Sequence, residues 1–190
     1  AVNYLVTDPT GNERLAPSTF DEPLKPKHKN SFTAQNSKVY PHTTLALALS
    51  DSEKKKLRAA VAKISEEEEL PVENFTKRAI AFLHQNHEYT RQTRIPEDDR
   101  EDPVLRWMLS KEKGHCEYFA YSYVLLARAA GHPARIVCGF AGGKWDNKTH
   151  SWVNLKTDAH AWAEVFAGTH WVRVEATPPE DGQGEDQQNQ

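Results

Sequence analysis

Cysteine is scarce in this sequence, and its scarcity excludes two classes of protein. The 190 residues contain only two cysteines, Cys116 and Cys138, so at most one disulfide can form. A small secreted scaffold held together by several disulfides is therefore excluded. The two cysteines do not form a Cys-x-x-Cys pair, which argues against a redox motif and against a structural zinc site.

Long apolar runs and an excess of positive charge are also missing. No apolar run approaches the ~18 residues that a membrane-spanning helix requires, so we expect no membrane span in this chain. The net charge is −3, which gives no sign of the basic face of a nucleic-acid-binding protein. A hydrophobic fraction of 38% and a charged fraction of 27% suit one globular domain. The chain starts at Ala1 without a signal-peptide pattern, so we expect a piece of a longer or processed protein.

Composition divides the chain into three parts. Residues 1–40 are rich in proline and polar residues and show no period, so an irregular N-terminal extension is expected. Residues 41–178 carry the regular patterns of a folded domain. Residues 179–190 are polar and are expected to form a disordered tail.

Local signals predict three helices in the first half of this domain. Leucines alternate with small residues over 45–49, which predicts a short strand before the helices. Ser50 and Glu53 have the spacing of a capping box, so a helix is expected to start there. Pro71 suits the start of the second helix, and Asp102 is expected to cap a short third helix.

The second half predicts one buried helix followed by strands. Residues 116–130 are apolar on nearly every side, as in a central helix, and Gly131 and Pro133 end it. Strand-like segments follow at 134–140, 150–155, 159–166 and 170–176. Helices followed by a run of strands predict an α+β fold with an antiparallel sheet.

Cys116 lies at the first turn of the predicted central helix. There the free backbone N–H groups and the helix dipole favour a negative charge, and the pKa of a thiol can fall from ~8.5 to about 3.5–7.5. Gly114 leaves backbone room for a substrate to approach the sulfur. The alternative interpretation is a small buried hydrophobe, which is commoner for a free cysteine. We apply it to Cys138, which alternates with Ile136 and Phe140 on one strand face.

A histidine and a glutamate complete a possible catalytic set. His160 and Trp162 share one face of their strand, and a two-residue turn at 167–168 would place His160 directly opposite Glu175. Glu164 shares that face but lies roughly 13 Å along the strand, too far to orient the imidazole. A cysteine nucleophile, a histidine base and an orienting carboxylate together perform acyl transfer through a thioester.

These residues resemble a known family. GHCEYFAYSYVLLARAAGHPARIVCGF, followed by HAWAEVF and WVRVEATP, is similar to the motifs of the bacterial transglutaminase-like superfamily over roughly residues 75–178. The resemblance implies a papain-like core in which the cysteine helix packs on an antiparallel sheet. It also implies that Cys116 is the nucleophile, His160 the base and Glu175 the orienting residue. The family usually has Asp followed by Pro where this chain has Glu175.

The resemblance suggests a role for Tyr89 and a location, and the strand face shared with His160 suggests a role for Trp162. Tyr89 belongs to the motif that leads to the cysteine, and we expect it to be the side-chain donor to the oxyanion. Trp162 is expected to shield the imidazole or to line the acyl pocket. Domains of this type often occur in extracytoplasmic parts of bacterial membrane proteins, which implies an extracytoplasmic location here.

Three functions remain open at this stage. The first is thiol-dependent acyl transfer on a protein or peptide amide, with water or an amine as acceptor. The second is a cysteine peptidase or amidase with the same triad, and the third is an interaction domain with a decayed site. No cofactor is expected. The even spacing of His150, His160 and His170 is not a zinc-ligand pattern, so no metal is expected either. His87, on the polar side of its helix, is expected to be solvated.

Overall fold

The fold is a layer of helices packed on one antiparallel sheet. The computed structural model describes residues 2–7, 13–18, 44–92 and 100–179. The helices are α3 (Asp51–Ser65), α4 (Val72–Asn86), α5 (Pro103–Met108), α6 (Cys116–Ala129) and the short 3₁₀ helix η1 (Lys156–Asp158). The strands are β1 (Val2–Thr7), β2 (Glu13–Ser18), β3 (Ala134–Ala141), β4 (Lys144–Asp146), β5 (Ser151–Val153), β6 (Ala159–Phe166) and β7 (Trp171–Val174). The α+β expectation is confirmed.

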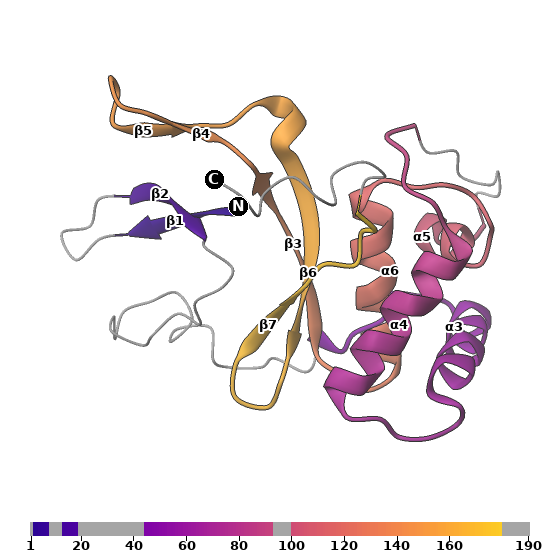
Figure 1. Cartoon of the computed structure of the whole chain (residues 1–190). Helices are drawn as coiled ribbons and strands as arrows, with labels where there is room; N and C mark the ends of the chain where they lie inside the picture. Colours follow the sequence, from indigo (N-terminus) through magenta and orange to yellow (C-terminus); the bar gives the residue numbers. More distant parts are fainter. Residues whose placement is uncertain (1, 8–12, 19–43, 93–99, 180–190) are drawn as a thin grey trace, which may run out of the picture.

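The order of the strands in the main sheet and the position of α6 on it bring together segments that are far apart in the sequence. The main sheet has the order β2-β1-β3-β6-β7, and every neighbouring pair is antiparallel. Figure 1 shows α3 to α6 gathered on one side of this sheet, with α6 nearest to it. Helix α6 packs on both β3 and β6. The start of α6 is therefore held beside the strands that carry the predicted histidine.

The predicted helix starts are confirmed. Ser50 caps α3, and its capping box with Glu53 is complete. The Glu53 carboxylate also accepts the Asp102 N–H at 2.6 Å. Hydrogen bonds from Ser50, first, and then from Asp102 lower the pKa of Glu53. Asp102 in turn caps α5 through the N–H groups of Val104 and Leu105. The Glu53 carboxylate therefore links the start of α3 to the start of α5.

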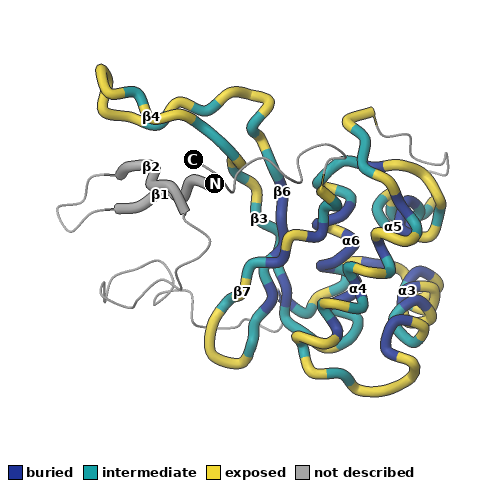
Figure 2. Tube along the Cα trace, in the orientation of Figure 1, coloured by how far each residue is buried: buried dark blue, intermediate teal, exposed yellow. Residues whose placement is uncertain are grey.

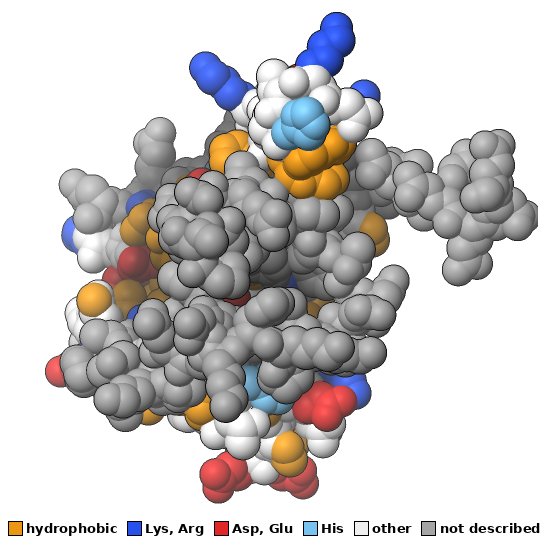
Figure 3. Space-filling model, turned by 90° about the vertical axis from the view of Figure 1, so that its left-hand side faces the viewer, with side chains coloured by type: hydrophobic (Ala, Val, Ile, Leu, Met, Phe, Trp, Pro, Cys, Tyr) orange, Lys and Arg blue, Asp and Glu red, His pale blue; other side chains and the backbone are white. Residues whose placement is uncertain are grey.

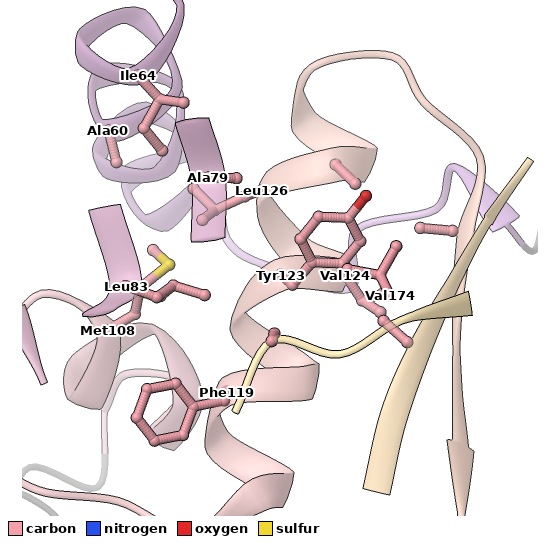
Figure 4. Packing of buried hydrophobic residues seen from close by; sticks show 14 of the residues in the cluster. Ala60, Ile64, Ala79, Leu83, Met108, Phe119, Tyr123, Val124, Leu126 and Val174 are labelled. Carbon is pink, nitrogen blue, oxygen red and sulfur yellow. The ribbon is translucent and has the colours of Figure 1, made fainter. Parts of the chain in front are cut away.

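The hydrophobic core is built around α6. Figure 4 shows this helix between side chains of α4 and α5, such as Leu83 and Met108, and Val174 of β7. Tyr123 is fully buried, and its hydroxyl lies 2.7 Å from that of Thr76 in α4. Burial raises the pKa of Tyr123 to about 12, so the phenol stays neutral. Figure 2 shows burial concentrated where α6 meets the sheet and the other helices.

The N-terminal segment differs from its expected irregular structure. Residues 2–7 and 13–18 form β1 and β2, and β1 extends the sheet by pairing Val2 with Ala141 and Asn3 with Phe140. Pro17 is tolerated because β2 is the edge strand. Because β1 pairs with a strand that is far away in the sequence, no short-range pattern predicts this pairing. The remaining residues of the extension up to residue 40, and tail residues 180–190, lie outside the described part of the chain.

The strand expected over 45–49 is wrong. Leu49 is buried and Leu47 packs against the same core, but this segment has no strand partner among the described residues. Arg128 of α6 donates a hydrogen bond to the Ala46 carbonyl at 2.8 Å. Burial of every second residue does not require a strand partner, so the alternation of leucines also fits a segment that packs Leu47 and Leu49 against the core without pairing.

A separate hairpin projects beyond the main sheet. Strands β4 and β5 pair with Trp145 opposite Trp152, whose ring centroids lie 5.7 Å apart. Trp145, Val153 and Leu155 are exposed. Figure 3 shows hydrophobic side chains beneath basic and histidine side chains at the upper end of one face, where Figure 1 places this hairpin. Within the described residues, no helix has the length and apolar character needed to cross a membrane.

Candidate active site

Cys116 is the first residue of α6, as expected. The preceding residue, His115, has extended backbone and its side chain makes no cap hydrogen bond, so it does not occupy the backbone N–H groups of the first turn. Gly114 forms an isolated bridge with Tyr89: its N–H donates to the Glu88 carbonyl at 3.0 Å and its carbonyl accepts the Thr90 N–H at 2.8 Å. This bridge brings the segment after α4 next to the nucleophile candidate.

Gly114 is required by packing. A Cβ at this position would lie 2.5 Å from Cζ2 of Trp107, a fully buried side chain. The Trp107 indole donates to the Lys113 carbonyl at 3.1 Å and stacks on His87 with ring centroids 3.9 Å apart. The sequence predicts room for a substrate beside Gly114, whereas in the structure the Trp107 indole fills the space next to its Cα.

His87 is buried, so the expectation that it is solvated is wrong. Only 3% of the residue is exposed, and its ring nitrogens lie 2.8 Å from the Glu112 carbonyl and 3.2 Å from the Met108 carbonyl. The imidazole therefore ties the end of α4 to the segment between α5 and α6. That segment ends at the nucleophile candidate.

His160 lies between the thiol and a carboxylate. Its Nε2 lies 2.8 Å from Oε2 of Glu175, which leaves Nδ1 for the thiol side. The hydrogen bond with Cys116, first, and then that with Glu175 raise the pKa of His160 to about 9 against the opposing effect of burial. The structure thus brings together the three residues that the sequence selects, and the imidazolium form is favoured at neutral pH.

The route by which Glu175 reaches His160 differs from the expected one. Phe166 pairs with Trp171, so the hairpin connection comprises four residues, 167–170, and the two-residue turn is wrong. The Ala167 N–H donates to the His170 carbonyl across this connection. Two additional loop residues move the register by two positions, which conserves the face of each side chain. Glu175 therefore stays on the side of His160 but follows the end of β7 instead of pairing opposite the histidine.

Three donors surround the Glu175 carboxylate. Besides His160, Oε2 accepts from Nη2 of Arg173 at 2.9 Å, and Oε1 accepts the Thr177 N–H at 3.2 Å. Partial burial acts to raise the pKa of Glu175, but the interactions with His160, Arg173 and Thr177 outweigh it, so the pKa is lowered. No motif in the sequence points to Arg173, although its place two residues before Glu175 puts both on one strand face.

Trp162 forms the wall behind the imidazole. Only 2% of the residue is exposed, and its ring lies nearly parallel to that of His160 with centroids 6.3 Å apart. A Cβ at Gly139, which pairs with His160 across the sheet, would lie 2.8 Å from Cη2 of Trp162. Trp162 was expected either to shield the imidazole or to line the acyl pocket. This arrangement favours shielding, since Trp162 is not among the residues that line the cleft around the thiol.

A cleft of about 330 Å³ opens at the thiol. Tyr89 lines it, as its expected role beside the oxyanion requires. Basic and hydroxyl side chains outside the sequence motifs also contribute. The lining residues are Tyr89, Arg91, His115, Cys116, Glu117, Lys156, Thr157 and Ala159. The cleft thus joins the start of α6 to the segment that leads into β6.

Cys138 is exposed, so its expected place in the core is wrong. Strand β3 is buried at Ala134 but exposed at Phe140, because this end of the strand extends beyond the helix layer. Partial burial, first, and then the charges of Glu117 and Cys116 raise the pKa of Cys138. The second cysteine therefore lies within electrostatic reach of the first.

In the described part of the chain, no group of three or more His, Cys, Asp or Glu side chains could hold a metal ion.

Comparison with known proteins identifies the family. The profile of the transglutaminase-like superfamily matches residues 58–176, which include all three candidate catalytic residues. The chain belongs to this superfamily. Members of the transglutaminase-like superfamily are typically cysteine enzymes, which agrees with a thiol at the start of a buried helix.

Two curated proteins are similar to this transglutaminase-like chain. An uncharacterized protein, YebA, of Bacillus subtilis is 30% identical over 154 residues, which are 75% of this chain and 20% of that protein. A protein-glutamine gamma-glutamyltransferase of Pseudomonas aeruginosa is 32% identical over 93 residues, 48% of this chain and 14% of that protein. The chain thus spans a fifth or less of the length of these relatives.

Solved structures support the same fold. The periplasmic domain of TgpA from Pseudomonas aeruginosa bound to ethylmercury has a TM-score of 0.59 and 25% identity, covering 74% of this chain and 50% of that one. A second structure of that periplasmic domain gives a TM-score of 0.58 with 26% identity, covering 74% and 48%. The transglutaminase-like fold is therefore common to this chain and to that periplasmic domain.

Proposed function

We propose that this domain catalyses thiol-dependent acyl transfer from glutamine side chains of proteins or peptides, with Cys116 as nucleophile. The observation that carries the proposal is the position of His160, whose pKa is raised by its interaction with Cys116 and whose Nε2 lies 2.8 Å from Oε2 of Glu175. The name of the Pseudomonas aeruginosa relative, a protein-glutamine gamma-glutamyltransferase, supports glutamine as the acyl donor.

The chemistry follows from the residues in the cleft. The Cys116 thiolate attacks the carboxamide carbon, and the negative charge that develops on the oxygen is stabilised by the Cys116 N–H and by the Tyr89 hydroxyl. The His160 imidazolium then gives its proton to the departing ammonia, which leaves a thioester on the sulfur. In the second half, neutral His160 removes a proton from the acceptor, and Glu175 stabilises the imidazolium that forms.

The acceptor decides which product appears. An amine attacking the thioester gives a cross-link or an amine adduct, and water gives glutamate. The same thiolate attacking a backbone amide would release a peptide, so a peptidase shares the first half of this mechanism. These outcomes differ in mass and are separable in one experiment.

The test is a reaction with a blocked peptide that contains one glutamine, with and without a biotin-linked primary amine, analysed by mass spectrometry. The proposal predicts an adduct that has lost ammonia, or without amine a gain of about one dalton on glutamine. The Cys116→Ala variant should lose this activity and keep its unfolding temperature. Backbone cleavage as the sole product would support the peptidase instead. Absence of all three products under conditions where the protein is folded would contradict an enzymatic function.

We further propose an extracytoplasmic location for this domain, supported by its similarity to the periplasmic domain of TgpA. Protease added to cells with a permeabilised outer envelope should degrade the domain in its parent protein while a cytoplasmic marker survives. Protection of both would contradict this location.

A further inference from the structure

We infer that Arg173 is a positioning residue that holds the Glu175 carboxylate against His160. This inference rests on the proposed function, because it assigns a role within the same catalytic set. It concerns a residue that is not among those lining the cleft and that contacts the catalytic set through the Glu175 carboxylate.

The Glu175 carboxylate needs such support. Its side chain is 40% exposed, and it projects from the end of β7 with no ladder partner opposite it. A partly exposed glutamate has several rotamers in which its oxygens would face water instead of the imidazole. Compared with the aspartate that usually occupies this position, the additional methylene adds one rotatable bond.

Arg173 is itself fixed. Its side chain is only 13% exposed, and its guanidinium lies 4.4 Å from the centroid of the Trp162 ring, the wall behind His160. The N–H groups of a guanidinium lie in its own plane, so a guanidinium stacked on an aromatic face can still donate sideways to a carboxylate. One of them donates to Oε2 of Glu175 at 2.9 Å, the same oxygen that contacts His160. The Thr177 N–H holds the other oxygen, so both carboxylate oxygens have a donor supplied by the same strand end.

The sheet contains a second set with the same chemistry and no contact with the cleft. Arg135 of β3 lies 4.2 Å from the centroid of the Trp171 ring and donates from Nε to Glu164 at 2.7 Å. Arg135 therefore provides a matched control for the loss of a stacked, paired arginine from this sheet. A purely structural contribution of Arg173 should be reproduced by the same substitution at Arg135.

The experiment compares Arg173→Met with Arg135→Met. The first readout is the titration of His160 by NMR in histidine-labelled protein, with the signal assigned by His160→Gln. If Arg173 holds Glu175 in place, its loss lets the carboxylate turn to water, and the pKa of His160 falls by about half a unit relative to Arg135→Met. Loss of the arginine charge alone would act in the opposite direction and raise the pKa of His160.

The second readout is steady-state kinetics with the glutamine peptide. We expect kcat of Arg173→Met to fall about tenfold with little change in KM, because substrate binding is unaffected while the base is misoriented. Unchanged or raised pKa of His160, or kcat equal to that of Arg135→Met, would overturn the inference. An inactive wild-type protein would refute the proposed function alone, because the NMR titration needs no turnover.

Discussion

The His160 imidazole and the Glu175 carboxylate are joined at 2.8 Å although the two residues are not opposite each other in the β6–β7 hairpin. The ladder ends with Ala163 opposite Val174, so Glu175 must reach along the strand axis to contact the ring. The glutamate side chain is long enough to bridge this offset.

Shortening this side chain should therefore reduce activity. Glu175→Asp keeps the carboxylate but withdraws it by about one methylene from the imidazole. We expect kcat to fall about tenfold with KM nearly unchanged. Steady-state kinetics with the glutamine peptide measure both constants. A Glu175→Asp variant as active as the wild type would show that the strand end adjusts and that the offset does not select glutamate.

The pH dependence of catalysis follows from the raised pKa of His160. Because this pKa is about 9, the imidazolium is present throughout the neutral range and is lost as the pH rises through about 9. The value of kcat/KM should therefore stay high at neutral pH and fall along an alkaline limb near pH 9. In Glu175→Gln the loss of the negative charge should move this limb to lower pH. An alkaline limb near the ordinary histidine value of ~6.5 in the wild type would contradict the assignment.

Gly114 is predicted to be sensitive to the smallest substitution. Its Cβ would overlap the Trp107 ring at 2.5 Å, so Gly114→Ala should lower the free energy of unfolding by about 1–3 kcal/mol. Because the cysteine lies two residues later, activity per folded molecule should fall as well. Denaturant unfolding measures the first effect and active-site titration the second.

Gly168→Ala is the matched control for this substitution. Gly168 has a φ of +83° in the hairpin connection, and a Cβ there has no atom within 4 Å. We expect backbone strain to lower stability without changing activity per folded molecule. Equal loss of activity in both variants would show that the effect of Gly114→Ala is general destabilisation.

Local chemistry explains what the sequence could predict. Ser50 and Glu53 satisfy each other within one helical turn, and Asp102 caps α5 by bonding its own near neighbours. Such signals need no knowledge of distant residues. Gly131, with a φ of +85° after α6, belongs to the same class. The family motifs likewise selected three residues that the fold brings together.

Contacts between distant residues explain what the sequence could not predict. The pairing of β1 with β3 depends on a strand edge more than a hundred residues away. His87 lies on a face that is polar by pattern, yet it is buried because the 108–114 segment covers it. Cys138 alternates like a core residue, but the helix layer ends before it. For His87 and Cys138, the burial of the side chain was decided by how far a neighbouring element extends.

The most direct test of the Cys116–His160 pair is the pH dependence of iodoacetamide alkylation, measured separately at Cys116 and Cys138 by peptide mapping. Cys138 provides an internal control, since its raised pKa leaves little thiolate at neutral pH. We predict that Cys116 is alkylated about tenfold or more faster than Cys138 at pH ~6, and that His160→Ala removes this difference. Equal, slow labelling of both cysteines at pH ~6 in the folded wild-type protein would contradict a poised thiolate–imidazolium pair and favour an interaction domain.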